Sequence, residues 1–143
     1  MELPFRRIRP DAPLPSFAHA GDAALDLTSM IDVEIAPGSR AMVPTGVAVA
    51  IPEGYAGLVL PRSGLAARVG LTLANTPGLI DSGYRGEVTC ALSNTDHVRS
   101  VRVQKGDRVA QLLVVPVAAL QPLWAEELPD SERGEGGFGS SGR

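Results

Sequence analysis

Short apolar segments that alternate with a period of two, separated by turn-forming residues roughly every ten positions, most limit how this chain can fold. Val47, Val49 and Ile51 are predicted to share one face of a strand. Similar segments span residues 55–60, 87–94, 98–103 and 108–117, and the strings "APGSR", "PEG", "TPG", "DSGYRG", "NTDH" and "QKGD" supply the turns. No segment has a sustained helical period. The pattern predicts an all-β chain folded as an antiparallel sandwich or barrel.

One short segment, "PRSGLAARVG", departs from this pattern. It predicts one or two helical turns with Ser63 at or near the N-cap and Gly70 as the stop. The first backbone N–H groups of a helix lack partners within the helix, and free N–H groups attract anions.

Composition excludes several classes of function. A length of 143 residues favours one domain, and 44% apolar residues are enough for a core. The net charge of −3 leaves no broad basic face for nucleic acid. No apolar run is long enough for a signal peptide or a membrane span. The single cysteine, Cys90, permits no internal disulfide, so we expect a cytoplasmic protein.

The C-terminal end changes in character after residue 117. Residues 118–132 are acidic and interrupted by prolines, and we interpret them as an arm that follows a β-barrel domain of residues 1–117. Residues 133–143 contain "RGEGGFGSSG", which lacks the lysine and the flanking elements of a P-loop. This flexible tail is either a linker or a peptide that wraps a polyanion, with Arg133 adding charge and Phe138 stacking on a base.

The string "TPGLIDSGYRGEV" contains the clearest candidate for a catalytic turn. Asp81 either caps its own hairpin or orients and deprotonates a water molecule. Tyr84 offers a ring to a sugar, and Asn75 offers an amide to a base edge. Gln111 interrupts an apolar strand, so it faces either outward or a ligand.

The small number of histidines and cysteines limits which metal sites and catalytic nucleophiles the chain can have. His19 and His97 are the only histidines and lie far apart, so with Cys90 they cannot build a zinc site or a catalytic triad. Cys90 lies in a strand pattern that favours burial over nucleophilic attack. Any metal must therefore be bound by oxygen atoms, which suggests Mg²⁺ held through phosphates.

Taken in order, the strings "AGDAALDL", "PRSGLA", "GLIDSGYRGEV", "GDRVAQLL" and "RGEGGFGSSG" resemble the five motifs of the trimeric deoxyuridine triphosphate nucleotidohydrolases (dUTPases). The resemblance spans about residues 20–142. It implies a jelly-roll-like β-barrel subunit, a homotrimer with shared active sites, and a dUTP diphosphatase that uses Mg²⁺. The products would be dUMP and pyrophosphate, which limits uracil incorporation into DNA and supplies dUMP for dTMP synthesis.

The same resemblance assigns roles to residues. Asp81 would activate the water that attacks the α-phosphorus, and Asp26 would hold the deoxyribose region and waters near Mg²⁺, with no protein ligand to the metal itself. The substrate-binding residues would be Arg62, Ser63, Gly64, Asn75, Gly78, Ile80, Tyr84, Gln111, Arg133, Phe138, Gly139, Ser140 and Ser141. The glycine-rich tail would come from another subunit and close over the nucleotide as a lid.

Two rival functions share this fold. The related deoxycytidine triphosphate deaminases carry a glutamate in the strand after the hairpin, where this chain has Ala91 in "TCALSN", and alanine cannot transfer protons. A non-catalytic trimeric nucleotide sensor or protein-binding module would have no need of a carboxylate at position 81 or of a complete tail.

Overall fold

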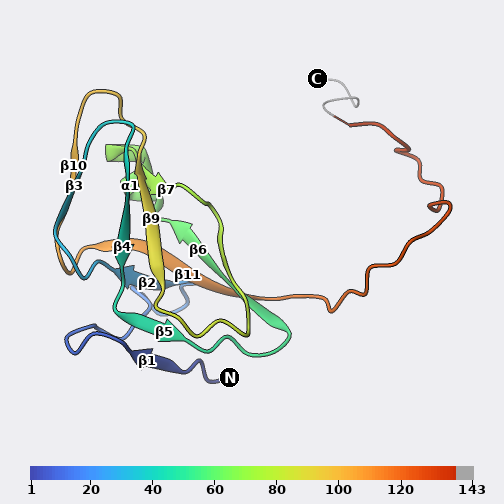
Figure 1. The fold of residues 1–143 in the computed structure, drawn as a ribbon, viewed down its shortest axis with the longest axis horizontal. Helices are drawn as coiled ribbons and strands as arrows, with labels where there is room; N and C mark the ends of the chain where they lie inside the picture. The colour runs from blue at the N-terminus through green and yellow to red at the C-terminus, as the bar shows by residue number, and fades with distance from the viewer. Residues whose placement is uncertain (138–143) are drawn as a thin grey trace.

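Eleven strands and one helix form the regular structure of residues 1–137, which are the residues that this computed structural model describes (Figure 1). In chain order they are β1 (Phe5–Arg7), β2 (Leu25–Thr28), β3 (Val33–Ile35), β4 (Arg40–Pro44), β5 (Val47–Val49), β6 (Tyr55–Pro61), α1 (Ser63–Val69), β7 (Leu71–Leu73), β8 (Gly78–Ile80), β9 (Thr89–Asn94), β10 (Val101–Val103) and β11 (Arg108–Pro116). The predicted all-β class is confirmed.

The strands form four antiparallel groups that wrap around one core. The largest sheet has the order β2-β11-β6-β8, and a second has the order β4-β9-β7. The pairs β1-β5 and β10-β3 complete a jelly-roll-like, distorted barrel. The predicted segments from residue 40 onward all became strands. Strands β1, β2, β3, β7 and β8 were not predicted, because segments of three or four residues are too short to display an alternation.

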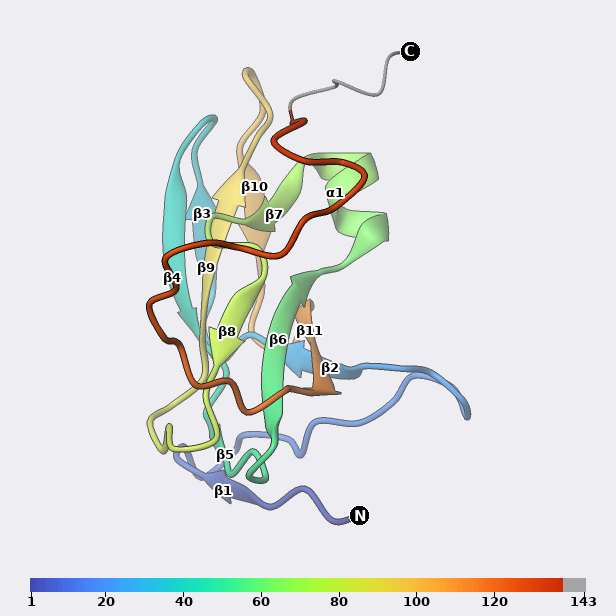
Figure 2. The same cartoon turned by 90° about the vertical axis from the view of Figure 1, so that its right-hand side faces the viewer.

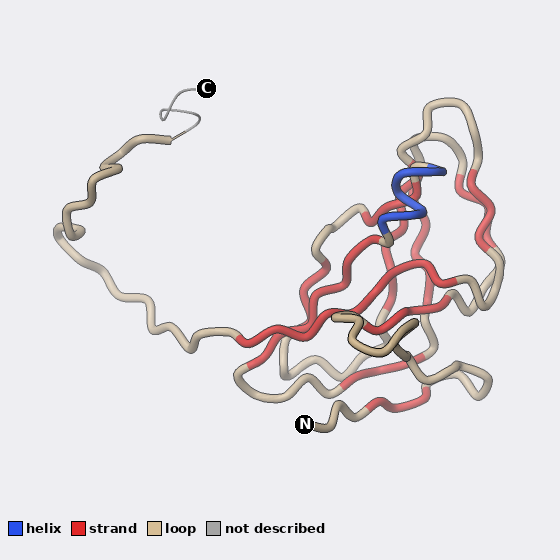
Figure 3. The backbone as a smooth tube through the Cα atoms, turned by 180° about the vertical axis from the view of Figure 1, so that it is seen from behind, coloured by secondary structure: helices blue, strands red, loops and turns tan. Residues whose placement is uncertain are grey.

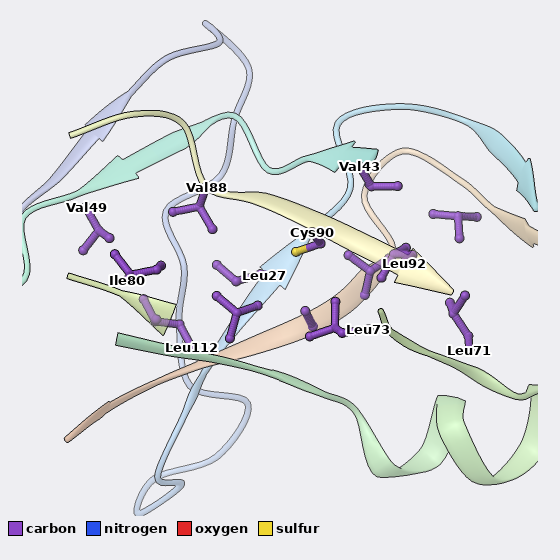
Figure 4. Close-up of a cluster of buried hydrophobic side chains, with 14 of the residues drawn as sticks. Leu27, Val43, Val49, Leu71, Leu73, Ile80, Val88, Cys90, Leu92 and Leu112 are labelled. Carbon is purple, nitrogen blue, oxygen red and sulfur yellow. The ribbon is translucent and has the colours of Figure 1, made fainter. Parts of the chain in front are cut away.

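The core contains aliphatic side chains from both larger sheets, as Figure 4 shows. Leu27 of β2, Val43 of β4, Leu92 of β9 and Leu112 of β11 are each at most 1% exposed. Removal of this apolar surface from water is the main force that holds the sheets together. Because alternate residues of a strand point to opposite faces, Gln111 and Leu113 of β11 and Leu58 and Leu60 of β6 point away from this core.

The seven-residue helix α1 follows β6 directly and lies at its end (Figure 2). Its N-cap is Arg62 in an extended conformation, and Ser63 is the first helical residue, so the prediction of Ser63 at or near the N-cap is confirmed. Gly70 ends the helix with a φ of 69°, in the left-handed region that favours glycine. Among residues 1–137 the structure has no helix long and apolar enough to cross a membrane.

The chain leaves the barrel after β11. The backbone N–H of Val117 donates to the carbonyl of Gly54 at 2.8 Å, and residues 118–137 contain no strand or helix. This segment extends away from the body of the protein (Figures 1 and 3). Its large apolar side chains, Leu120, Leu123, Trp124 and Leu128, are all at least 80% exposed.

Burial in the core should make Cys90 inert toward thiol reagents. It is 1% exposed, and burial raises the pKa of its thiol to about 12. Because only the thiolate is nucleophilic, we expect native protein to react with a disulfide reagent at pH 8 far more slowly than protein in denaturant. Absorbance of the released thiolate measures both rates. Equal rates in the two conditions would contradict this burial.

Candidate functional site

A cleft of about 400 Å³ lies at the junction of β2, β11, β6 and α1. Asp26, Arg62 and Gln111 line it together with the first turn of α1. Pairing within the large sheet brings these residues together, since Gln111 lies opposite Asp26 on one side and Leu60 on the other. Four segments that are far apart in the sequence therefore contribute to one concave surface.

The carboxylate of Asp26 holds two arginines in place. Its Oδ1 atom lies 3.2 Å from Nε of Arg62, and its Oδ2 atom accepts a hydrogen bond from Nη1 of Arg108 at 3.1 Å. Arg62 also donates through Nη1 to the carbonyl of Arg108 at 3.2 Å. The Asp26 side chain is only 14% exposed, so this pair is screened less by solvent than a surface ion pair. The guanidinium groups are thereby oriented before any ligand arrives.

Gln111 belongs to the wall of the cleft. Its Nε2 atom donates to the carbonyl of Pro61 at 3.0 Å, which fixes the amide next to the start of α1. Of the two interpretations of this residue from the sequence, the one aimed at a ligand agrees better with this position, because the side chain lines the cleft.

The first turn of α1 contributes Ser63 and Gly64 to the cleft, and Arg68, one helical turn later, lines the same cleft. Nε of Arg68 donates to the carbonyl of Gly64 at 3.1 Å. A Cβ atom at Gly64 would lie 3.1 Å from Nη2 of Arg68, so glycine leaves room for the guanidinium to lie across the first turn. Arg68 is therefore a second arginine in the wall of the cleft.

A smaller pocket of about 170 Å³ lies at the hairpin that follows β8. It is lined by Asn75, Gly78, Ile80, Asp81 and Tyr84, and on its β9 side by Cys90 and Ala91. The four residues that the sequence predicted for base and sugar recognition are thus brought together with Asp81, the predicted catalytic residue. The position that would hold a glutamate in the deaminases is occupied here by Ala91.

Asp81 lies immediately after β8 and begins a tight turn. Its backbone carbonyl accepts a hydrogen bond from the N–H of Tyr84 at 3.1 Å. The Asp81 side chain is exposed and makes no hydrogen bond to the part of the chain that the structure describes. The hairpin is therefore closed by backbone atoms, which weakens the interpretation of Asp81 as a capping residue and leaves its carboxylate open to a ligand.

The cleft and the hairpin pocket occupy different parts of the same sheet. Asp26 lies on β2, opposite Gln111 and hence level with Leu60, whereas Ile80 is level with Gly57 on the other side of β6. Asp26 and the end of β8 are three strands apart across the sheet and three residues apart along the strands. With ordinary strand dimensions this corresponds to roughly 15–20 Å. One chain therefore does not bring Asp81 to the arginines of its own cleft.

Arg133 belongs to the C-terminal segment that extends away from the barrel (Figure 1). Its Nε donates to the carbonyl of Gly136 at 2.7 Å, within a turn. The other predicted residues of the tail, Phe138, Gly139, Ser140 and Ser141, lie outside the described residues.

Sequence reasoning did not assign a role to Arg108, although it belongs to the motif that contains Gln111. Simple alternation places residues 108 and 111 on opposite faces of a strand. The register of β11 against β2 shifts between Arg108 and Ala110, and this irregularity allows Arg108 to reach Asp26. Proximity to Gln111 in the motif was the only signal available in the sequence.

Within residues 1–137, no group of three or more His, Cys, Asp or Glu side chains is arranged so that it could hold a metal ion. Both carboxylate oxygens of Asp26 are already paired with arginine. This donor set does not suit a metal bound directly by protein. It suits an ion held by a phosphorylated ligand and water, because Mg²⁺ keeps several waters and often binds through phosphates.

Comparisons with known proteins agree with this architecture. The dUTPase family model matches residues 10–142. The chain is 54% identical over 142 residues to the deoxyuridine 5'-triphosphate nucleotidohydrolase of Streptomyces coelicolor, covering 99% of this chain and 78% of that protein. The dUTPase of Staphylococcus bacteriophage 80alpha, solved with dUPNHPP, is 34% identical with a TM-score of 0.93 over 99% of both chains.

A second solved structure concerns a metal. It is a mutant dUTPase from phage phi11 of S. aureus, described as revealing the coordination of a structural Mg(II) ion. It is 29% identical to this chain, with a TM-score of 0.83 over 89% of this chain and 98% of that one.

Proposed function

The chain belongs to the dUTPase family, whose reaction is the hydrolysis of dUTP, and from this premise we propose how its residues perform that reaction. Asp81 aligns and deprotonates a water molecule that attacks the α-phosphorus. The new bond joins the water oxygen to that phosphorus, and the bond to the oxygen that bridges to the β-phosphorus breaks. The products are dUMP, pyrophosphate and one proton. The observation that carries this proposal is the exposed carboxylate of Asp81, which has no partner within residues 1–137 and lies beside Tyr84 and Asn75 in one pocket.

The cleft around Asp26 supplies the phosphate site. Arg62, Ser63, Gly64 and Gln111 meet phosphate oxygens, and Asp26 holds the deoxyribose region and nearby waters while it fixes the arginines. Charge that develops on the phosphate oxygens is best stabilised by donors that are oriented in advance. The paired geometry of Arg62 and Arg108 around Asp26 provides that orientation.

The hairpin pocket supplies the selectivity for uracil and deoxyribose. Asn75 and the backbone of Gly78 and Ile80 contact the base, and the ring of Tyr84 packs against the sugar and leaves no room for a 2′-hydroxyl. Arg133 reaches the γ-phosphate, and Phe138, Gly139, Ser140 and Ser141 close over the nucleotide. Closure of such a lid excludes bulk water from the reacting atoms.

Mg²⁺ is proposed as the cofactor. It neutralises charge on the triphosphate and would be held through phosphate oxygens and waters, because the described residues offer no cluster of ligands. A cytoplasmic location is also proposed, supported by a composition that permits no internal disulfide. There the reaction would limit uracil in DNA and supply dUMP for dTMP synthesis.

A homotrimer is proposed because one chain separates the two parts of the site. The hairpin of one copy would meet the cleft of a second, and the tail of another copy would cover both. The register places Leu58, Leu79 and Leu113 on the outward face of the large sheet, and Leu79 is 64% exposed. Association over this face would bury apolar surface next to the cleft. The exposed apolar residues of the C-terminal segment also favour packing against another copy.

A parallel assay with dUTP, UTP, dTTP and dCTP, with and without Mg²⁺, tests the proposed function. We expect pyrophosphate release from dUTP alone, faster with Mg²⁺, because the 2′-hydroxyl of UTP, the methyl group of dTTP and the amino group of dCTP each conflict with the hairpin pocket. Ammonia release from dCTP would support the deaminase instead, and binding of dUTP without turnover would support the sensor.

Replacement of Asp81 by asparagine tests the catalytic carboxylate. The change keeps the size of the side chain and removes the base, so we expect turnover of dUTP to fall by at least about 1,000-fold. The affinity for dUDP, measured by calorimetry, should stay within a few-fold of wild type. A variant that retains substantial turnover would remove Asp81 from the mechanism.

Deletion of residues 133–143 tests the lid. Because these residues follow the barrel and the arm, we expect a chain that still folds and trimerises, with turnover reduced at least about 100-fold. Light scattering and thermal unfolding report assembly and folding independently of activity. A truncated chain that unfolds would show instead that the tail has a structural role.

A further inference from the structure

The position of the Tyr84 ring is set within its own hairpin. The hydroxyl of Tyr84 donates to the backbone carbonyl of Glu87 at 3.0 Å, three residues along the chain. The backbone N–H of Tyr84 donates to the carbonyl of Asp81 at 3.1 Å. The backbone of Tyr84 and the hydroxyl at the far end of its ring are therefore both held, and the ring lies against Gly86, one of the two residues between Tyr84 and Glu87.

Gly86 leaves the space that the ring needs. A Cβ atom at this position would lie 2.6 Å from Cζ and 3.0 Å from Cε2 of Tyr84, and closer still to the hydroxyl oxygen. Such separations are far inside ordinary van der Waals contact. The φ angle of Gly86 does not lie in the left-handed region, so its backbone conformation alone does not require glycine. What requires glycine here is the ring of Tyr84.

The hairpin cannot easily move to relieve that overlap. Oε1 of Glu87 accepts hydrogen bonds from Nε of Arg9 at 3.1 Å and from the N–H of Gly46 at 2.9 Å. The next residue, Val88, is 3% exposed and pairs through its N–H with the carbonyl of Val47 at 2.8 Å. The backbone after Gly86 is thus tied to the N-terminal segment and to β5, so a side chain at position 86 would displace the ring.

We propose that Gly86 is a specificity-determining position that holds the Tyr84 ring where it excludes a 2′-hydroxyl, with Glu87 as its anchor. This inference rests on the proposed function, which assigns Tyr84 to the sugar. Gly86 does not touch the nucleotide and acts only through Tyr84, so it is a positioning residue. Arg9 holds Glu87 through their hydrogen bond and thereby contributes to the choice of sugar. Arg9 itself lines neither the cleft nor the hairpin pocket.

The test measures how strongly the Gly86→Ala variant prefers deoxyribonucleotides over ribonucleotides. Calorimetry with dUDP and UDP, neither of which is the substrate, gives the ratio of the two affinities, and assays with dUTP and UTP give the ratio of kcat/KM. We expect both ratios to fall at least about ten-fold, because the displaced ring admits the extra hydroxyl. A variant that merely lost stability would lower the active fraction and leave both ratios unchanged.

Gly83→Ala is the matched control. Gly83 lies in the same hairpin and also has a φ outside the left-handed region, but a Cβ atom there would meet nothing within 4 Å. Its ratios should stay within about two-fold of wild type. If Gly83→Ala and Gly86→Ala lower the ratios equally, the proposal is wrong.

Tyr84→Phe is the second variant, and it decides the question if Gly86→Ala does not fold. Loss of the hydrogen bond to Glu87 frees the ring, so we expect the dUDP to UDP affinity ratio to fall several-fold. When Tyr84→Phe is added to Gly86→Ala, the logarithm of the affinity ratio should change by less than half as much as it does in the single Tyr84→Phe variant. The reason is that Gly86→Ala has already broken the hydrogen bond between Tyr84 and Glu87. An unchanged ratio in Tyr84→Phe, or additive effects, would overturn the proposal.

The binding and hydrolysis measurements also separate this inference from the proposed function. Wild-type protein that prefers dUDP but does not hydrolyse dUTP would overturn the proposed function alone. Wild-type protein that hydrolyses dUTP selectively, with the same selectivity in Gly86→Ala, would overturn this inference alone.

Discussion

The pairing of β11 with two neighbours at once is the constraint on which the rest of the site depends. This nine-residue strand pairs with β6 along seven positions and with β2 along four. One face of the strand contributes Leu112 to the core, and the opposite face presents Gln111 and Leu113 to the cleft. A shift of one residue in either pairing would exchange these faces, burying a glutamine and exposing a leucine. The hydrophobic core therefore also fixes the cleft.

One carboxylate, that of Asp26, orients two arginines at the cleft. Arg62 and Arg108 approach the same Asp26 side chain, and each would repel the other if that carboxylate were neutral or absent. Because Asp26 is largely buried and both of its oxygens are used, it serves better as an orienting group than as a proton acceptor or a metal ligand. Asp81, to which we assign the role of base in the proposed mechanism, is exposed, and its carboxylate has no partner among the described residues.

The separation of the site into two parts has a simple physical origin. A sheet presents its strands in order, and β2 and β8 form opposite edges of the four-stranded sheet. In the proposed mechanism, groups on opposite edges meet at one nucleotide through a second copy of the chain. The outward leucines beside the cleft and the exposed apolar residues of the C-terminal segment give such copies surfaces on which to associate. The proposed assembly and the proposed catalytic site would then both follow from the order of the strands.

The sequence by itself determined the all-β class, most of the strands from residue 40 onward, the burial of Cys90 and the family. Alternation and turn residues are local patterns that can be read directly from the sequence. The order of the five motifs can be read in the same way, without knowledge of the fold. Tertiary structure alone decided that Arg108 reaches Asp26, since a register irregularity reverses the simple alternation. It also decided that the ring of Tyr84 depends on the bare Cα of Gly86, and that cleft and hairpin lie apart. These facts depend on distances between segments that are remote in the chain, or on the conformation of one turn, and neither is encoded in a local pattern of residue types.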